Sequence, residues 1–340
     1  MSVVALAGGV GAARFLRGLV RALPPEQLTV IVNTGDDREF YGVHVSPDLD
    51  IVTYTLAGRV DAERGYGLTG DSFAVIEALA AYGHPTWFKL GDRDLATCLH
   101  RTQRLRAGAG LAQIADEIRR AHGLACRILP MSDDPCPTFV LLSNSARVHF
   151  EEYLVRDGAP NDVEGVDLSA AEAARPAPGV CEAIAAADTI LVCPSNPIVS
   201  IGPILALPGV REALARSRAP VVAISPIIGG MPVKGPADRL LRGTGAEVSA
   251  RGVARLYASW CHGFVLDQRD AEQVSDVAAL GLAARAVDTL MLDVAISEAL
   301  ARTCLALADE LRVRVKAGHS LARSEPQASE AQQDRSEVNQ

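Results

Sequence analysis

The chain opens with a short apolar run that leads through glycines directly into a helical pattern. Residues 3–7 are apolar throughout, the turn GGVG spans residues 8–11, and residues 12–23 carry Phe15, Leu16 and Leu19 at helical spacing. This order predicts a strand, a tight turn and a helix, which is the repeating unit of a parallel sheet. The first two dozen residues therefore favour an α/β fold over all-α and all-β folds.

Later segments repeat the alternation. Further strands are predicted at residues 28–32, 125–129, 138–142, 149–154, 189–192 and 221–224, and helices at 48–60, 70–83, 109–122, 179–187, 209–216 and 237–244. The pattern predicts a doubly wound, mostly parallel Rossmann-like sheet with a helical insertion, at about residues 55–122, that covers the active site. We expect one domain over residues 1–317 and a disordered tail over 318–340, where apolar periodicity ends.

Composition narrows the class of partner. The chain has 340 residues, 49% of them hydrophobic and 4% aromatic, and a formal net charge of −8. That charge argues against broad nucleic-acid or membrane binding and favours small-molecule substrates. The seven cysteines include no CxxC pair, and the first apolar run is too short for a signal or membrane segment. We therefore expect reduced thiols and a cytoplasmic protein.

The glycine turn is the first candidate site. Glycines at a strand-to-helix junction let the backbone approach a phosphate, and the free N–H groups of the helix start favour an anion. Arg14 can add a charge-assisted contact. The turn has no Walker A lysine and departs from the dinucleotide pattern GxGxxG, so it predicts phosphate binding without predicting NAD. A tight turn that needs glycine for steric reasons alone is the alternative.

Acidic residues gather after the second strand. Asp36 and Asp37 follow that strand, and Asp48 and Asp50 begin the next helical pattern. Carboxylates at the carboxyl edge of a parallel sheet suit Mg²⁺ shared with substrate phosphates. Helix capping is the alternative role for these carboxylates. We favour a functional role for Asp36 and Asp37 and a capping role for Asp48, and the position of Asp50 fits either role.

Three more polar segments are candidates for the same site. The segment LGDRDLAT at residues 90–97 builds either a polar site or a salt-bridged helix start, with the second slightly favoured. The segments PSNP at 194–197 and SPIIGG at 225–230 follow predicted strands and lie where doubly wound sheets bind nucleotides.

Taken together, these segments resemble the 2-phospho-L-lactate transferase family of the CofD/UPF0052 group. The matching stretches are LAGGVGAARFLRG (6–18), VNTGDD (32–37), SPDLDIVTYTLAG (46–58), LGDRDLATCLHRT (90–102), PMSDD (130–134), HFEEYLV (149–155), PSNPIVSIGPILALPGVREAL (194–214) and SPIIGGMPVKGPA (225–237). No single piece is specific, but their combination and order are.

The resemblance implies a transferase of coenzyme F420 biosynthesis. Such enzymes move a phospholactyl, phosphoenolpyruvyl or phosphoglyceryl group from a guanosine-diphosphate-linked donor to the ribityl hydroxyl of the deazaflavin Fo. F420-0 or its dehydro form is produced, and GMP leaves. The resemblance also implies Mg²⁺ and a homodimer, and the sequence leaves open which three-carbon acid is carried.

Site roles follow from the resemblance as expectations. Asp36 and Asp37 are expected to be catalytic, and Asp37 and Asp50 to hold the metal. Donor-binding residues are expected to be Gly8, Gly9, Val10, Gly11, Arg14, Asn33, Thr34, Ser195, Asn196, Pro197, Ser225, Gly229 and Gly230. Acceptor-binding residues are expected to be Asp71, Ser72, Trp87, Asp92 and Arg93. The alternatives are a CofD-like nucleotide-binding regulatory protein without transferase activity and an NAD-type or nucleotide-sugar Rossmann enzyme.

Overall fold

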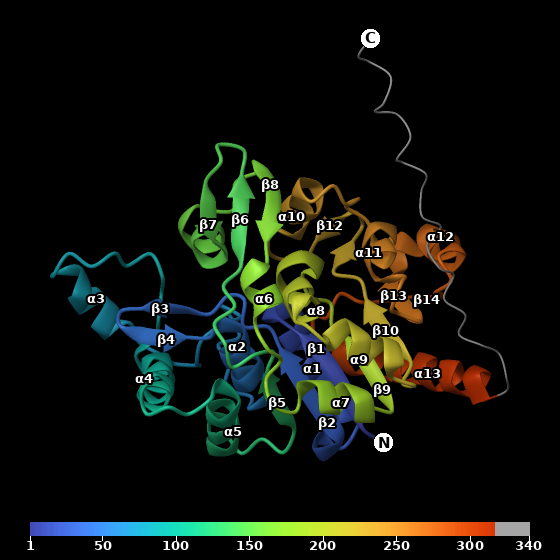
Figure 1. Cartoon of the computed structure of the whole chain (residues 1–340), viewed down its shortest axis with the longest axis horizontal. Coiled ribbons are helices and arrows are strands. Elements are labelled where there is room, and N and C mark those ends of the chain that lie inside the picture. Colours follow the sequence, from blue (N-terminus) through green and yellow to red (C-terminus); the bar gives the residue numbers. More distant parts are fainter. Residues whose placement is uncertain (317–340) are drawn as a thin grey trace, which may run out of the picture.

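A parallel sheet forms the centre of the molecule (Figure 1). The structure, a computed structural model, describes residues 1–316; the tail predicted at 318–340 lies outside them. The seven strands run in the order β14-β13-β10-β9-β1-β2-β5, and every pair is parallel. Their bounds are β1 (Val3–Ala7), β2 (Leu28–Val32), β5 (Arg127–Pro130), β9 (Thr189–Val192), β10 (Val221–Ile224), β13 (Gly263–Asp267) and β14 (Ala283–Val287).

Helices cover both faces of this sheet. Alternate residues of each strand point to opposite faces, so Val3 and Ala5 join one core cluster while Val4 and Leu6 join the other. The first cluster packs on α1 (Gly9–Ala22), α2 (Pro47–Leu56), α5 (Leu111–Ala121) and α13 (Val294–Lys316). The second packs on α6 (Ser169–Ala173), α7 (Val180–Ala186), α8 (Gly202–Ala206), α9 (Val210–Arg216), α10 (Ala237–Gly243), α11 (Ala250–Tyr257) and α12 (Val274–Ala279). The sheet is doubly wound, as predicted.

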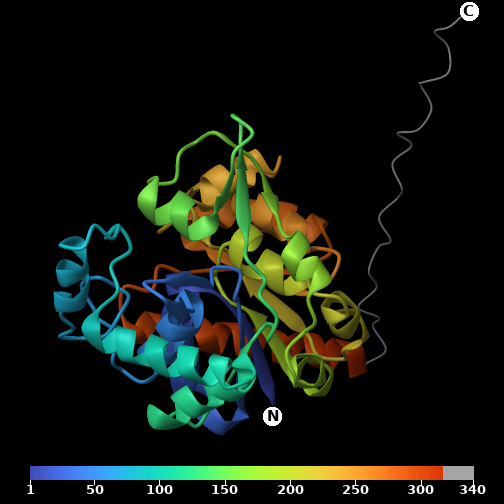
Figure 2. The same ribbon diagram turned by 60° about the vertical axis from the view of Figure 1, so that its left-hand side comes forward.

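Two smaller units project from the sheet (Figure 2). One is an antiparallel sheet of β6 (Phe139–Leu142), β7 (Arg147–His149) and β8 (Val163–Asp167) with its own apolar cluster. The other, which we call the wing, combines the hairpin of β3 (Arg38–Phe40) and β4 (Val43–Val45) with α3 (Ala74–Ala80) and α4 (Asp92–Arg106). The remaining elements are the β11 (Ile227–Ile228) and β12 (Met231–Pro232) hairpin and short helical turns at Pro25–Gln27, Glu152–Arg156, Pro197–Ile201 and Gln268–Gln273.

The strand predicted at 149–154 is wrong. β7 ends at His149, and Glu152–Arg156 forms a wide helical turn. Phe150 and Tyr153 are both buried in the cluster of the small sheet, and their spacing of three residues matches a helical period better than a strand. The strand predicted at 138–142 forms, but it lies in the small antiparallel sheet outside the parallel core.

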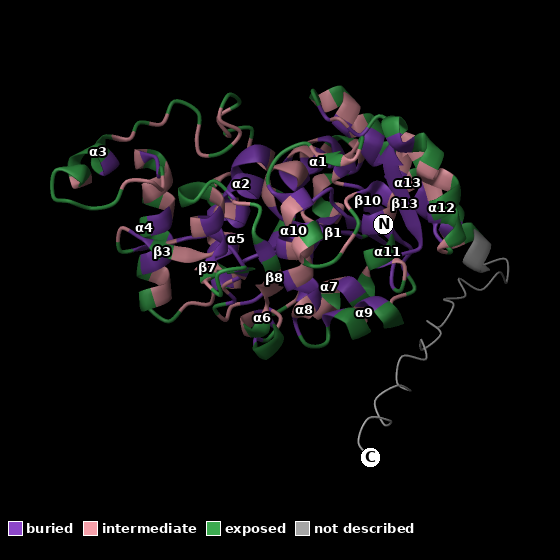
Figure 3. Ribbon diagram, turned by 90° about the horizontal axis from the view of Figure 1, so that it is seen from above, coloured by how far each residue is buried: buried purple, intermediate pink, exposed green. Residues whose placement is uncertain are grey.

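The central sheet and the wing differ in how far their residues are buried (Figure 3). The central strands are buried, whereas α3 and the loops of the wing are largely exposed. Within residues 1–316, no single helix is long and apolar enough to cross a membrane; only the sharply bent pair at 197–206 and 210–216 passes by length and composition when taken together. Ile204 and Leu214 of that pair are fully buried in the core.

Candidate active site

A cavity of about 510 Å³ opens at the carboxyl edge of the central sheet. Its wall includes the turn after β1, Asp36 after β2, residues 194–196 after β9 and Ser225 after β10. Parallel sheets gather the ends of several strands at one edge, which is where such folds bind ligands. The wing closes another side with Tyr66 and Trp87. The cavity therefore joins segments that are far apart in the sequence.

The glycine turn is fixed by close backbone contacts. Gly9 has a φ of 73°, which L side chains rarely adopt, and a Cβ on Gly8 would lie 2.7 Å from the Asp48 carboxylate. A Cβ on Gly11 would clash with the Pro194 carbonyl oxygen. The Ser195 hydroxyl accepts a hydrogen bond from Gly8 N at 3.1 Å and donates one to Gly8 O at 2.8 Å. The steric need for glycine and the phosphate-binding interpretation therefore both fit this turn.

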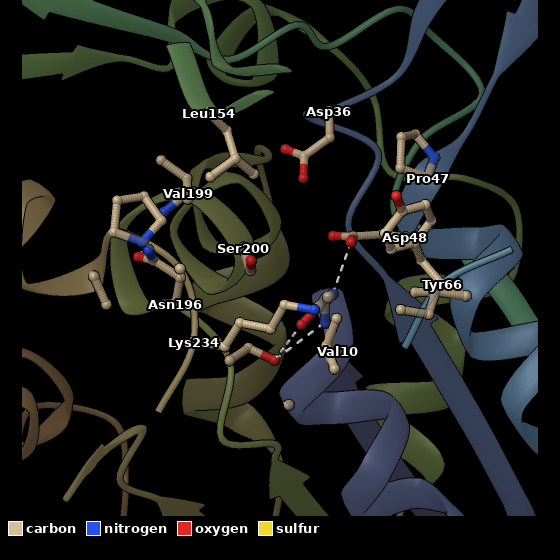
Figure 4. Close-up of a pocket in the computed structure, with 18 of the residues that line it drawn as sticks. Val10, Asp36, Pro47, Asp48, Tyr66, Leu154, Asn196, Val199, Ser200 and Lys234 are labelled. Carbon is tan, nitrogen blue, oxygen red and sulfur yellow. Dashed lines mark hydrogen bonds between the residues drawn. The ribbon is translucent and has the colours of Figure 1, made fainter. Parts of the chain in front are cut away.

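Three buried carboxyl groups meet beside the turn. Asp36, Asp48 and Glu151 all line the cavity, and none of them forms a salt bridge within residues 1–316. Figure 4 shows the carboxylates of Asp36 and Asp48 directed into the same space near Ser200. We call these three residues the unpaired cluster.

Burial and repulsion raise the pKa of each member. Burial, followed by repulsion from Asp48 and Glu151, raises the pKa of Asp36 well above its usual value. Burial raises the pKa of Asp48 to about 6, although hydrogen bonds from Asn33 and Gly9 oppose the shift. Burial and the charges of Asp48 and Asp37 raise the pKa of Glu151 to about 8. The cluster therefore carries a cost in the free protein that a cation would relieve.

These residues suit a hard divalent cation. Oδ1 of Asp36 is buried and has no hydrogen-bond partner among the described residues, and the same holds for Oδ1 of Asp37. Mg²⁺ prefers carboxylate oxygens and commonly uses one or two of them together with water and substrate phosphates. The donor set of the unpaired cluster therefore fits the Mg²⁺ that the resemblance implies.

Both residues predicted to hold the metal have other partners. Oδ2 of Asp37 accepts hydrogen bonds from the Ser46 hydroxyl at 2.6 Å and from the His44 ring at 3.0 Å. Asp50 forms a buried ion pair with Arg101, whose side chain is 1% exposed. Asp50 lines the cavity but Asp37 does not. Their predicted roles stay predictions. Both oxygens of Asp48 also accept hydrogen bonds, so the reasons to favour Asp36 and Asp48 are that both line the cavity, unlike Asp37, and that neither is paired with an arginine, unlike Asp50.

A second polar cluster lies between α2 and α4. It contains Asp50, Arg101, Asp94 and Tyr54, and the Tyr54 hydroxyl donates to Asp94 at 2.8 Å. Burial and the charge of Asp50 raise the pKa of Asp94 to about 7. Ligand atoms of Asp50, Asp94 and Cys98 lie within 4.8 Å of one another, but Arg101 already supplies a positive charge there. We call Asp50, Arg101, Asp94 and Tyr54 the paired cluster.

Two of the predicted acceptor residues, Asp71 and Asp92, cap helices of the wing. Asp92 accepts hydrogen bonds from the Ser72 hydroxyl at 2.6 Å and from two backbone N–H groups at the start of α3. Asp71 accepts from the backbone N–H groups of Arg93 and Asp94 at the start of α4. None of Asp71, Ser72, Asp92 and Arg93 lines the cavity, whereas Trp87 does. The structure therefore does not bring these four residues to the site.

Only some of the predicted donor residues line the cavity. Gly8, Gly9, Val10, Gly11, Arg14, Ser195, Asn196 and Ser225 line the cavity, whereas Asn33, Thr34, Pro197, Gly229 and Gly230 do not. Oδ1 of Asn196 accepts from Ile198 N and Val199 N, and so it caps the turn that follows β9. Asn33 is buried and donates to Asp48 at 2.9 Å. Asn33 therefore holds the Asp48 carboxylate in place without lining the cavity itself.

Sequence reasoning missed two members of this site. Asp48 was expected to cap α2, but it accepts from Gly9 N at 2.7 Å and so holds the glycine turn to that helix. Glu151 was placed in a strand. An acid between two buried aromatic residues, as in the segment HFEEYLV, is the signal that could have identified it.

Comparisons with known proteins identify the family of the chain. The family model described as 2-phospho-L-lactate transferase CofD matches residues 3–303. A phosphoenolpyruvate transferase of Kitasatospora aureofaciens is 49% identical, over 92% of this chain and 99% of that protein. A 2-phospho-L-lactate transferase of Methanosarcina acetivorans is 40% identical, over 90% of this chain and 99% of that protein.

A solved structure supports the fold. A UPF0052-family protein of Bacillus halodurans superposes with a TM-score of 0.60 at 18% identity, covering 89% of this chain and 98% of that one. The breadth of the family match and the identity to the transferases are decisive for the enzyme class. The chain therefore belongs to the CofD family and is a transferase.

Proposed function

We propose that this chain transfers a phosphoenolpyruvyl group from a guanosine-diphosphate-linked donor to the terminal ribityl hydroxyl of the deazaflavin Fo. GMP leaves, and dehydro-F420-0 is the product. The observation that carries the proposal is the single cavity in which a glycine turn faces an unpaired carboxyl cluster. The choice of donor rests on the relatives of Kitasatospora and Streptomyces, named phosphoenolpyruvate transferases, which are 47–49% identical. The methanogen phospholactate enzymes are 40% identical, as is the phosphoenolpyruvate transferase of Nocardia farcinica.

The glycine turn binds the donor phosphates in this proposal. Backbone N–H groups at the start of α1 and the nearby Arg14 guanidinium supply donors and positive charge to the phosphate oxygens. Oxygens of Asp36 and Asp48 would hold Mg²⁺, which would neutralise part of the diphosphate charge. Phosphoryl transfer depends mainly on such positioning and electrostatic stabilisation.

The unpaired cluster also takes the proton in this proposal. The ribityl oxygen bonds to the phosphorus that carries the three-carbon acid, the bond from that phosphorus to the GMP oxygen breaks, and the hydroxyl proton passes to Asp36. Asp36 suits this role because its Oδ1 has no other partner among the described residues.

The apolar side of the cavity suits the deazaflavin ring. Trp87, Phe150 and Leu154 form part of this wall, and Trp87 is fixed by an edge contact to Phe40 with ring centroids 5.3 Å apart. A flat ring stacks or packs on such side chains at little entropic cost. We also propose a homodimeric, cytoplasmic enzyme without nucleic-acid or membrane partners, consistent with the net charge of −8.

A competition among donors tests the proposal. The purified chain is incubated with Fo, Mg²⁺ and an equimolar mixture of the phosphoenolpyruvyl, phospholactyl and phosphoglyceryl guanosine donors, and the products are identified by mass. We expect dehydro-F420-0 to dominate, together with an equal amount of GMP. A dominant F420-0 product would overturn the donor choice, and no deazaflavin product from any donor would overturn the proposed reaction.

A further inference from the structure

Of three basic residues that line the cavity, Arg14, Lys89 and Lys234, two lie near enough for their charges to repel each other. Arg14 on α1 and Lys234, which follows β12, both line the cavity, and neither forms a salt bridge in the described part of the chain. Burial, followed by the nearby charge of Arg14, lowers the pKa of the Lys234 ammonium. Like charges held near one another cost free energy unless an anion lies between them.

Lysine is rare in this chain. Only three of its 33 basic residues are lysine, at positions 89, 234 and 316, and two of these line the same cavity. A chain that uses arginine almost everywhere else for its surface charge has a compact ammonium at this position. Lysine binds phosphate as a point charge and needs less space than the planar guanidinium.

The Lys234 ammonium has a weak, neutral partner. Its Nζ donates to the Arg64 carbonyl oxygen at 3.4 Å, near the upper limit for a hydrogen bond. The contact joins the loop after β12 to the loop between α2 and α3 across the cavity. Figure 4 shows the Lys234 side chain extended beside the glycine turn at Val10. The ammonium therefore has donors to spare within reach of a ligand on that turn.

We propose that Lys234 binds the donor phosphates together with Arg14, and that its Nζ leaves the Arg64 carbonyl for a phosphate oxygen when the donor binds. The inference deepens the proposed function and rests on it for the identity of the donor. It adds a residue that comes from the far side of the cavity, so the phosphates are held between α1 and the loop after β12. Substrate binding then fixes that loop.

Competitive acetylation of lysines tests this inference on the wild-type protein. The chain is treated briefly with acetic anhydride, alone, with GDP and Mg²⁺, or with inorganic pyrophosphate and Mg²⁺, and acetylation of Lys234 and Lys89 is measured by peptide mass spectrometry. We expect either ligand to slow acetylation of Lys234 by about tenfold, since a phosphate-bound amine is protonated and covered. Lys89 lies on the wing side of the same cavity and serves as the control, with little expected change.

The two ligands separate this inference from the proposed function. Protection of Lys234 by pyrophosphate but not by GDP supports the lysine site and counts against a guanosine donor. Binding of GDP in calorimetry without protection of Lys234 overturns the inference and leaves the donor intact. No protection by either ligand also overturns it.

Substitution provides a second readout. In Lys234→Met, the Kd for pyrophosphate with Mg²⁺ should rise about tenfold and should depend less steeply on salt, because one charge contact is lost. Lys234→Arg should restore part of the affinity, and Lys89→Met should leave it unchanged. An unaltered salt dependence in Lys234→Met would mean that the lysine only holds the loop to Arg64.

Discussion

The unpaired and paired clusters contain the same kind of residue in neighbouring parts of one cavity wall, and they differ in charge balance. Asp50 of the paired cluster has Arg101 beside it, and Asp94 accepts from Tyr54. Asp36, Asp48 and Glu151 have no salt-bridge partner in the described residues. Burial raises the pKa values of the acids in both clusters, so the counter-charge of Arg101 is what separates the two. Ionising a buried acid that has no counter-charge costs stability, so a fold that retains three such acids side by side indicates a ligand. The comparison assigns stability to the paired cluster and chemistry to the unpaired one.

The largest expected effect is on stability, from breaking the paired cluster. Arg101→Met leaves Asp50 buried without its counter-charge and should lower the free energy of unfolding by about 3–5 kcal/mol. Urea denaturation measures the change, and Arg302→Met, which removes an exposed helical pair with Glu298, is the matched control with a small expected effect. Equal losses in the two variants would contradict the division into paired and unpaired clusters.

Removing an acid from the unpaired cluster should lower kcat more than it changes stability. Asp36→Asn keeps the size of the side chain, removes the proposed proton acceptor and should lower kcat by about 100-fold or more. The melting temperature should stay the same or rise, because repulsion with Asp48 and Glu151 is relieved. Steady-state kinetics and thermal unfolding of the same preparation test both parts. Near-normal turnover would remove Asp36 from the chemistry.

The unpaired cluster also predicts a pH dependence of stability. The folded-state pKa of Glu151 is raised to about 8, so this group keeps its proton at a pH where the unfolded chain has released it. Its contribution to stability is therefore largest below the unfolded pKa of about 4.5 and falls as the pH rises towards 8. Denaturation from pH 5 to pH 8, roughly the window between those two values, should show a shallower decline in Glu151→Gln than in wild type. A steeper decline in the variant would contradict the predicted sign.

Mg²⁺ supplies a control for the pH experiment. Binding of the cation to Asp36 and Asp48 offsets the repulsion, so added Mg²⁺ should stabilise wild type most at the upper end of the pH range. An equal effect of Mg²⁺ on wild type and on Asp36→Asn would argue against that site.

The smallest effect is expected in the wing. Asp92 caps α3 at a distance from the cavity, so Asp92→Ala should cause a small loss of thermal stability with an unchanged KM for Fo. Trp87→Ala is the comparison variant, and it should raise that KM because Trp87 lines the cavity. A raised KM in Asp92→Ala would restore the acceptor role that the sequence predicted for this residue.

The parallel core was predictable because its signals are local. Apolar runs followed by glycine or polar turns identify β1, β2, β9 and β10, and each of these strands carries cavity residues at its end. The last two strands, β13 and β14, and helix α13 were not predicted. The helical turn after His149 was predicted as a strand because Phe150 and Leu154 also suit one.

The charge balance of the site was not predictable from the sequence. Asp50 and Asp48 lie two residues apart, yet one meets Arg101 from α4 and the other meets Gly9 from α1. Which acid is paired depends on tertiary contacts across 51 and 39 residues of chain. The same contacts explain why Asp71 and Asp92, which looked like binding residues, cap helices: their partners follow from the packing of α3 against α4.

The most direct test compares kcat of Asp36→Asn with that of the double variant Asp50→Asn/Arg101→Met, using the same donor, Fo and Mg²⁺. The double variant removes both charges of the buried pair together and leaves neither one uncompensated. The account predicts that kcat of the double variant stays within about fivefold of wild type, whereas that of Asp36→Asn falls by about 100-fold or more. The opposite order, with Asp36→Asn active and the folded double variant inactive, would contradict it and return the metal role to Asp50.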